Sequence, residues 1–592
     1  MAGVTYDITD NKVVIYTRGK ICSDSEELLS SALFLDIVGR FVDSLVKQQS
    51  PLLSIFDTHP VDRAVVRELA GFLRLLSRKP LAHLKSENHA FPIDISDIYP
   101  LAEFVEELYD FWRNFDRFLL CDSEGDGFDK RPYRTFNATI ESLTHLIRGA
   151  YRDVLENITE THPRIYRQVS AGAEIAAITI PVELALPAGA YERLKEIPVI
   201  RQVLINPPLI LNPPMNKRTG QFVRIESNPL DLFNAEWREW LCYPAKVGPL
   251  LVLIYFHQKF FELGFTLCNL FEIAGDEDLK RKPDAVYTFG VDSAALNPLG
   301  VFPTVFYEDA ANEIMVAAVP RKDEFGYFGY LKKMVLTLHN VKMMRAGKLP
   351  FHGAFVKIMM HGLPDTNILL IGDTGAGKSE TLEAFRTIGR DLMRRMVIIA
   401  DDMGSMDIDD EGNIIGYGTE IGAFLRLDDL QPGYGFGQID RSIIMSPAQI
   451  NARIVMPVTT YDVVMHGHTI DMILYANNYE EIDAEHPIIE RFKTVEDAFN
   501  TFREGTVMSK GTTTSTGIVH SYFANIFGPP QYKEIHDKLA LVFFNAFFSR
   551  RIFVGQLRTR LGISGYETRG PEEAARELLR MIGGDRDHQV RR

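Results

Sequence analysis

The chain has 592 residues, of which 46% are hydrophobic and 24% are charged, and its formal net charge is -15. A chain of this length exceeds a single hydrophobic core, so roughly two to four domains are expected. The acidic balance argues against a nucleic-acid binder with a broad basic surface, although a small basic pocket for an anion remains compatible with it.

Residues 1–165 are predicted to form a mainly helical region. The segments 25–48 and 62–79 space their apolar residues at helical intervals, and Asp24 or Ser25 can cap the first of them. No catalytic constellation occurs here. We therefore expect an accessory region, or one through which the chain forms a homo-oligomer.

Residues 166–350 show a different sequence pattern from the helical region that precedes them. Short apolar runs, such as 176–184 and 199–205, alternate with the proline-rich stretch 206–220. Such alternation is typical of strands joined by turns. We expect a second domain over this range.

A third domain is predicted over residues 351–580. It begins with a strand, a glycine-rich loop, a helix and another strand, and many short strands follow. The Gly-, Ser- and Thr-rich segment 503–517 suits a mobile lid. Residues 581–592 are expected to be a disordered tail. The predicted fold class is mixed α/β.

The four cysteines are widely spaced and form no CxxC pair, which indicates reduced thiols in a cytoplasmic protein. The N-terminus lacks a basic start followed by an apolar run, so no secretory signal is expected. No stretch of about 18 apolar residues is free of charge, so no membrane span is expected.

A phosphate-binding loop is the strongest motif. Residues 372–379, GDTGAGKS, match GxxxxGK[ST] between an apolar strand and an amphipathic helix. Its glycines let backbone N–H groups converge on phosphate, and the helix adds its positive dipole end. Lys378 can reach the outer phosphates, and Ser379 can ligate a divalent cation. The predicted nucleotide-binding residues are Gly372, Asp373, Thr374, Gly375, Ala376, Gly377, Lys378, Ser379 and Glu380.

Two aspartates end the next apolar strand. Asp401 and Asp402 follow the run VIIA, where a metal ion on the nucleotide would sit. The loop and the two aspartates, taken alone, are compatible with any NTPase or kinase. Glu380 directly after Ser379, with short strands beyond, is not typical of GTPases or of AAA-type motors.

Two segments resemble known families. GDTGAGKSE followed by ADD, with FHGAFV upstream, resembles the HPr kinase/phosphorylase family, whose core is related to that of phosphoenolpyruvate carboxykinases. Residues 327–355 are similar to the carboxykinase segment that runs Tyr-x-Gly-x-x-Lys-Lys, a helix, and Leu-Pro-x-His. The resemblance implies a P-loop-containing, carboxykinase-like two-lobed core.

The carboxykinase resemblance also implies roles for individual residues. Lys333, His352 and Asp402 would bind Mn²⁺. Lysine ligates a metal only when it is neutral, which requires a lowered pKa. Arg453, in NARIVMPV, would contact the transferring phosphoryl group. The residues implied to bind substrate are Tyr327, Gly329 and Arg224, and Arg218 is the alternative to Arg224.

The implied reaction is reversible decarboxylation of oxaloacetate with phosphoryl transfer, giving phosphoenolpyruvate and CO₂, as in gluconeogenesis. Mn²⁺, Mg²⁺ and ATP are the expected cofactors, with GTP or pyrophosphate as open alternatives. An HPr kinase-like enzyme is the second hypothesis, with Asp401 as general base on a protein serine or a small-molecule hydroxyl. A regulatory protein that only senses nucleotide is the third. Neither nucleic acid nor membrane is an expected partner.

Overall fold

The computed structural model describes residues 4–18, 21–56, 60–87, 93–122, 131–180, 182–220, 222–234, 236–300, 304–430, 436–510 and 516–583. These residues form a mixed α/β structure with 14 α-helices and several multi-stranded sheets. The chain divides into two compact units, which we call the N-terminal unit (Met1–Pro181 with Ile200–Asn206) and the C-terminal unit (Val182–Val199 with Pro207–Arg592). The boundaries predicted after residues 165 and 350 stay predictions.

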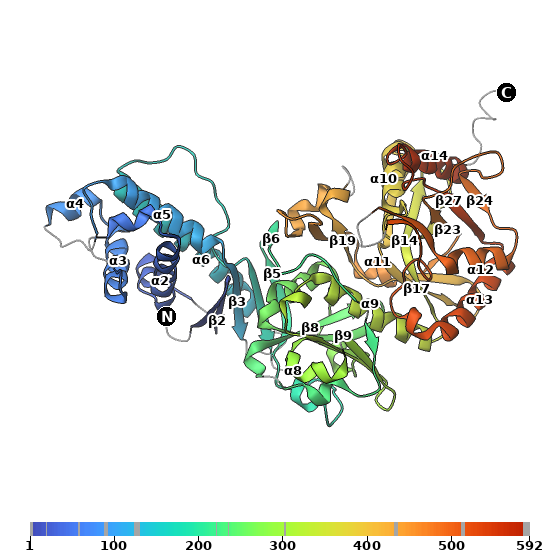
Figure 1. Ribbon diagram of the computed structural model, residues 1–592, viewed down its shortest axis with the longest axis horizontal. Coiled ribbons are helices and arrows are strands. Elements are labelled where there is room, and N and C mark those ends of the chain that lie inside the picture. Colours follow the sequence, from blue (N-terminus) through green and yellow to red (C-terminus); the bar gives the residue numbers. More distant parts are fainter. Residues whose placement is uncertain are drawn as a thin grey trace. The chain divides into compact units, whose positions relative to one another are not determined.

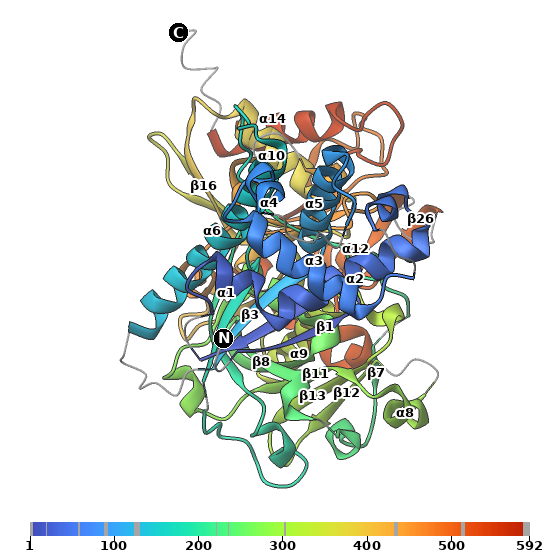
Figure 2. The ribbon, with the colours of Figure 1, turned by 90° about the vertical axis from the view of Figure 1, so that its left-hand side faces the viewer.

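The N-terminal unit combines helices with a sheet. Its strands lie in the order β1 (Thr5–Thr9), β2 (Lys12–Thr17), β3 (Asp116–Asp122), β4 (Ile175–Ile180) and β5 (Val199–Ile205). Its helices are α1 (Ser25–Leu29), α2 (Ala32–Gln48), α3 (Arg63–Leu76), α4 (Leu81–Ser86), α5 (Ile98–Arg113) and α6 (Arg131–Thr159). The helices gather against one face of β2 and β3 (Figures 1 and 2), and apolar side chains from both layers share one core. The expected helices are present, whereas the strands of this unit up to β3 were not predicted.

A first sheet of the C-terminal unit carries long buried strands. Their order is β8 (Trp240–Val247), β9 (Leu250–His257), β11 (Ala285–Val291), β13 (Ile314–Pro320), β12 (Val305–Asp309) and β7 (Val223–Arg224), and β10 (Glu272–Ile273) pairs with β8. Strands β9, β11 and β13 are parallel. The short helices α7 (Phe261–Thr266) and α8 (Ser293–Leu296) accompany them, and α9 (Phe328–Arg345) follows. Helix α9 is buried along most of its length and shows no polar face.

A second sheet carries the glycine-rich loop. Its strands lie in the order β22 (His468–Thr469), β18 (Ile414–Gly418), β17 (Met403–Ile408), β14 (Leu349–Met360), β15 (Thr366–Ile371), β23 (Met472–Asn477), β27 (Phe553–Arg558) and β24 (Ile489–Arg491), and β16 (Met393–Ala400) pairs with β14. Helices α10 (Lys378–Ile388) and α14 (Arg569–Gly583) pack on one side of β14, β15, β23 and β27 (Figure 1). The remaining helices of this unit are α11 (Tyr461–Met465), α12 (Val495–Glu504) and α13 (Lys533–Ser549).

Two smaller sheets complete the C-terminal unit. One has the order β19 (Gly422–Arg426), β21 (Arg453–Pro457), β20 (Ile443–Met445) and β6 (Leu209–Leu211). The other is the hairpin of β25 (Thr506–Lys510) and β26 (Thr516–His520), which overlaps the predicted lid 503–517 and extends beyond it. Residues 511–515 of the predicted lid and residues 584–592 of the predicted tail lie outside the described residues.

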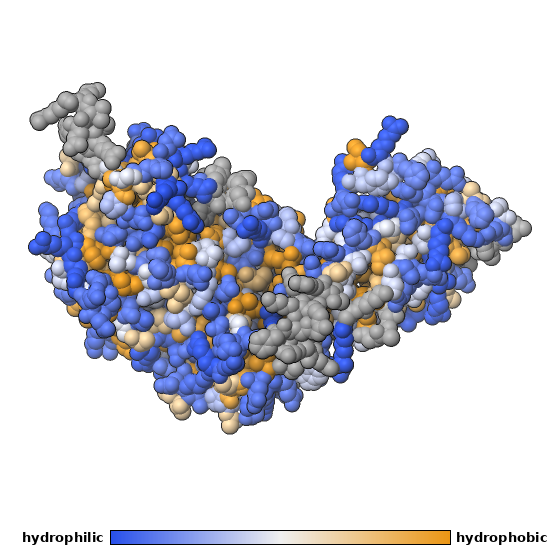
Figure 3. Space-filling model, turned by 180° about the vertical axis from the view of Figure 1, so that it is seen from behind, coloured by the Kyte–Doolittle hydropathy of each residue, from blue (hydrophilic) through white to orange (hydrophobic). Residues whose placement is uncertain are grey.

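The surface is mainly hydrophilic, in line with the share of charged residues in the sequence. Hydrophilic residues predominate on the face shown in Figure 3, with hydrophobic residues scattered among them. No helix in the described ranges combines the length and the apolar character that a membrane crossing requires.

Candidate functional site

The glycine-rich loop joins the end of β15 to the start of α10. Gly375 and Gly377 have φ values of +79° and +91°, in the left-handed region that favours glycine. A Cβ at Gly377 would also lie 2.5 Å from Thr559 Oγ1. Both the conformation and the close approach therefore require glycine at position 377.

The loop's carbonyl groups are held by other parts of the unit. The Asn478 amide donates to the Gly375 carbonyl at 2.9 Å, and the Thr559 hydroxyl donates to the Ala376 carbonyl at 2.7 Å. Lys378 Nζ donates to the Gly372 carbonyl at 2.6 Å. The N–H groups in the first turn of α10 have no intrahelical acceptors, so they remain available to an anion. Sequence analysis missed Asn478 and Thr559 because neither lies in a recognisable motif.

The loop forms one wall of a cleft with a volume of about 480 Å³. Segments that are far apart in the chain contribute its other walls, including the start of α9, strand β14 and the hairpin β25–β26. The predicted site residues that line the cleft are Tyr327, Lys333, His352, Asp373, Thr374, Gly375, Gly377, Lys378, Ser379, Glu380, Asp401, Asp402 and Arg453. Most of the residues that the sequence singled out are therefore brought together.

His352 and Asp402 form a close pair at the base of this cleft. The register of β14 against β17 places Met403 opposite His352, which brings Asp402 alongside the imidazole. His352 Nε2 lies 2.9 Å from Asp402 Oδ1, and His352 Nδ1 donates to the Ala524 carbonyl. A proton on Nδ1 leaves the Nε2 lone pair facing the carboxylate, so a proton or a cation is needed between them. Neighbouring ligands of an octahedral Mg²⁺-sized ion are about 3 Å apart, which matches this spacing.

Two adjacent lysines at the start of α9 have opposite environments. Lys332 Nζ lies 2.6 Å from Asp402 Oδ2 and 3.4 Å from Glu420 Oε1, and its side chain is 2% exposed. Burial alone would lower the pKa of Lys332, but these carboxylates outweigh it and raise the pKa. Burial, assisted by the charge of Arg218, instead lowers the pKa of Lys333 to about 8. Lys332 is thus a fixed cation, while Lys333 can become the neutral amine that a metal requires.

Glu420 is a site residue that sequence analysis missed. It is fully buried between β18 and β19, and the Thr419 hydroxyl donates to its Oε2. Burial raises its pKa to about 7. Burial would raise the pKa of Asp402 as well, but Lys332 and the hydrogen bond from His352 hold that pKa well below its usual range. Asp402 is therefore the carboxylate of this cluster that stays ionised.

Arg453 and Tyr327 lie on another wall of the cleft. Arg453 opens β21, and its guanidinium lies 5.3 Å from the centre of the Phe424 ring. Tyr327 is buried, and burial raises the pKa of its hydroxyl despite the nearby charge of Arg453. A Cβ at Gly329 would lie 2.3 Å from Tyr327 Cε1. Gly329 is absent from the described cleft lining and makes room for the tyrosine ring, so its role is packing.

The structure does not bring Arg224 to the cleft. Its guanidinium lies 5.2 Å from the centre of the Tyr532 ring and 3.6 Å from Glu226, and its side chain is 40% exposed. Arg218, the alternative, is also absent from the described lining of the cleft, although its charge lowers the pKa of Lys333. Arg224 lies in the two-residue strand β7, and the resemblance that implied a substrate-binding role for it did not fix where its side chain points.

A metal in this cleft would depend on the lysine amine. Among the described residues, no group of three or more His, Cys, Asp and Glu side chains is arranged to hold a metal ion. Lys333 lines the same cleft as His352 and Asp402, and its amine is a further candidate donor. The cleft therefore contains an amine, an imidazole and a carboxylate, which are donor types that can ligate a divalent cation.

Comparisons with known proteins assign no family to this chain. No protein-family model matches the chain, and a search of curated proteins gives no match either.

Proposed function

We propose that the chain is a phosphoenolpyruvate carboxykinase-like enzyme. It would decarboxylate oxaloacetate and transfer a phosphoryl group from a nucleotide, expected to be ATP, to the enolate oxygen, giving phosphoenolpyruvate and CO₂. The observation that carries the proposal is that Lys333 lines the same cleft as the His352–Asp402 pair and the glycine-rich loop, and burial there lowers the pKa of Lys333 to about 8. The fold in this proposal is a P-loop-containing, carboxykinase-like core.

Metal binding is assigned to three of these side chains. Lys333, His352 and Asp402 would hold Mn²⁺, and Ser379 would ligate the Mg²⁺ of the nucleotide. A bound divalent cation supplies charge stabilisation for enolate and phosphoryl oxygens. Lys332 keeps Asp402 ionised and oriented through its 2.6 Å ion pair.

The other residues act on the substrates. The N–H groups of the loop hold the nucleotide phosphates, and Lys378 exchanges its carbonyl partners for phosphate oxygens. Arg453 offers a fork of donors to the transferring group. Arg218 pairs with a substrate carboxylate, and Tyr327 positions the substrate. The hairpin β25–β26, which contributes Val507 and Ser509 to the lining, excludes water that would protonate the enolate.

A hydroxyl kinase of the HPr kinase type is the second candidate, because Asp401 lines the cleft together with Lys378. There Asp401 would accept the proton of a serine or of a small-molecule hydroxyl. Such a reaction has no evident need for a neutral lysine beside a metal, and this favours the carboxykinase-like reaction.

The direct test is product formation by the purified full-length chain. Oxaloacetate and Mn²⁺ are supplied with ATP, GTP or pyrophosphate, and phosphoenolpyruvate is followed by ³¹P NMR. We expect product with at least one donor, a loss of at least a hundredfold in Lys333→Met and His352→Asn, and little change in the matched control Arg224→Ala. Folded protein that yields no phosphoenolpyruvate with any donor would refute the proposal, and phosphorylation of a hydroxyl instead would support the kinase.

A further inference from the structure

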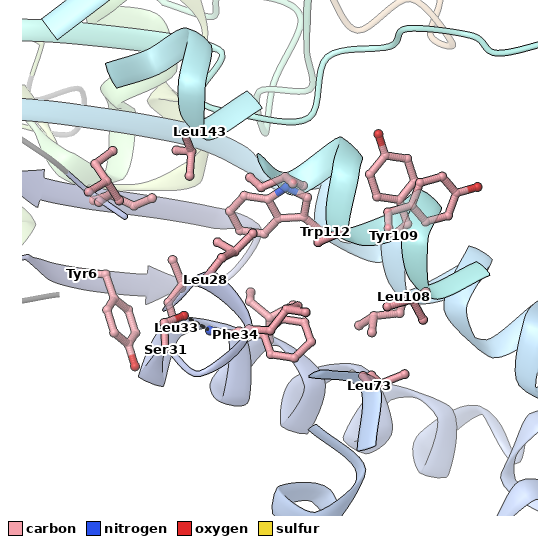
Figure 4. A pocket seen from close by; sticks show the side chains of 18 of the residues that line it. Tyr6, Leu28, Ser31, Leu33, Phe34, Leu73, Leu108, Tyr109, Trp112 and Leu143 are labelled. Carbon is pink, nitrogen blue, oxygen red and sulfur yellow. Dashed lines mark hydrogen bonds between the residues drawn. The ribbon is translucent and has the colours of Figure 1, made fainter. Parts of the chain in front are cut away.

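The N-terminal unit contains a hollow in its hydrophobic core. The hollow has a volume of about 120 Å³ and is lined by side chains from β1, β2, α1, α2, α3, α5 and α6. Figure 4 shows Phe34, Leu73, Leu108 and Trp112 around it. Protein interiors are close-packed, with few voids larger than a water molecule. A hollow of this size is therefore a feature to be explained.

Most of the polar groups of the lining are already engaged. Trp112 Nε1 donates to the Ala171 carbonyl at 2.7 Å. The Tyr151 hydroxyl donates to Glu106 at 2.6 Å, and the Tyr6 hydroxyl donates to Asp36 at 2.6 Å. A buried water needs two to four polar partners, so the hollow favours neither water nor a polar ligand.

The aromatic side chains at one end are held in place. The rings of Tyr109 and Tyr151 stack with their centroids 4.0 Å apart and their planes 7° from parallel. These rings and Trp112 come from α5 and α6, which pack against each other. The wall is therefore a fixed surface, which lowers the entropy cost of binding.

We propose that this hollow is a binding site for a hydrocarbon group, either an aromatic ring or the end of an alkyl chain. An apolar cavity of about 150 Å³ takes up benzene, so the volume here suits a group of roughly six carbons. The group can belong to a neutral molecule or to an amphiphile whose polar end remains in water. The site is independent of the reaction proposed for the C-terminal unit.

Brominated probes test the proposal, because bromine quenches tryptophan fluorescence on contact. The full-length chain is titrated with 1-bromohexane and, separately, with 6-bromohexanoate. Trp112 is the tryptophan of this unit, and the other two, Trp237 and Trp240, belong to the C-terminal unit. We expect saturable quenching that disappears in Trp112→Phe. Binding of the neutral probe alone indicates an uncharged ligand, and binding of both indicates that an anionic end is tolerated.

A variant whose side chain fills the hollow provides the second test of the proposal. Ala150 is buried in the lining, so Ala150→Phe should occupy the hollow and weaken probe binding at least tenfold. The matched control Ala64→Phe lies on the exposed side of α3 and should bind as the wild type does. If Ala150→Phe fails to fold, the proposal is tested by the difference in quenching between the wild type and Trp112→Phe. Quenching that never saturates, or that a folded Ala150→Phe leaves unchanged, would overturn the proposal.

Discussion

Methionine substitutions at the two adjacent lysines of α9 should change stability in opposite directions. Lys332→Met leaves Asp402 and Glu420 buried without the ammonium that lies 2.6 Å and 3.4 Å from them. Removal of one partner from a buried ion pair costs about 3–5 kcal/mol. The pKa of Lys332 is raised above its ordinary value of 10.5, so this contribution is fully present at neutral pH and is lost only as pH rises beyond that value.

Lys333→Met should instead stabilise the C-terminal unit. The pKa of Lys333 falls from 10.5 to about 8, so the folded state disfavours its charge. That difference corresponds to about 3 kcal/mol, and because solvent reaches part of this side chain we expect a gain of roughly 1–2 kcal/mol. The gain should be complete below pH 8 and should shrink as pH rises from 8 to 10.5, because in this range the folded chain has lost the proton that the unfolded chain still carries.

Urea unfolding in metal-free buffer measures both changes. A Trp112→Phe background leaves Trp237 and Trp240 to report on the C-terminal unit alone. Lys348→Met is the matched control, since Lys348 pairs with Asp407 at 2.8 Å but is 30% exposed, and such a pair contributes about 0–1 kcal/mol. Changes of the same sign at positions 332 and 333 would refute this account of the site.

Three further outcomes follow from the site. Gly377→Ala should reduce nucleotide affinity at least tenfold in equilibrium dialysis, because φ is +91° and the methyl group would meet Thr559; unchanged affinity would contradict the loop's role. Mn²⁺ affinity, measured by electron paramagnetic resonance, should rise between pH 6.5 and 8.5 as Lys333 loses its proton. The part of this rise that is due to the lysine should be absent in Lys333→Met. If the variant and the wild type show the same dependence of affinity on pH, the amine is excluded as a ligand. Arg453→Lys should lower kcat about a hundredfold with little change in KM, and an effect on KM alone would reassign Arg453 to ground-state binding.

The parts of the site that could be predicted are those that a short contiguous pattern encodes. The loop 372–379 carries its own geometry, because the glycines, the lysine and the helix start are local. Lys333 and His352 were implied by the resemblance of residues 327–355 to a carboxykinase segment, and both line the cleft. Glu420 was missed because it reaches Lys332 only through the folding of β18 and β19 against α9, and no local pattern marks such an encounter.

The same distinction separates the elements of the fold that the sequence predicts from those that it does not. Helices α2 and α3 have clear apolar faces, so their periodicity predicts them. Strand β3 is buried at nearly every position, and a short apolar run of this kind cannot be told from a helical segment. Helix α9 is buried on all sides, so periodicity gives it no face, and the sequence could not show that Lys332 and Lys333 meet different surroundings.

The two lysines are also coupled, and this leads to a last test. The charge of Lys332 lowers the pKa of Lys333, and Lys332 also pairs with the Asp402 carboxylate, whose charge raises that pKa. Lys332→Gln should therefore raise the pKa of Lys333 and move the pH at which Mn²⁺ affinity increases upward, although no metal ligand has been changed. Circular dichroism verifies that the variant is folded, and Lys348→Gln serves as the control. An unshifted midpoint in a folded variant would show that Lys332 supports the structure without tuning the amine beside it.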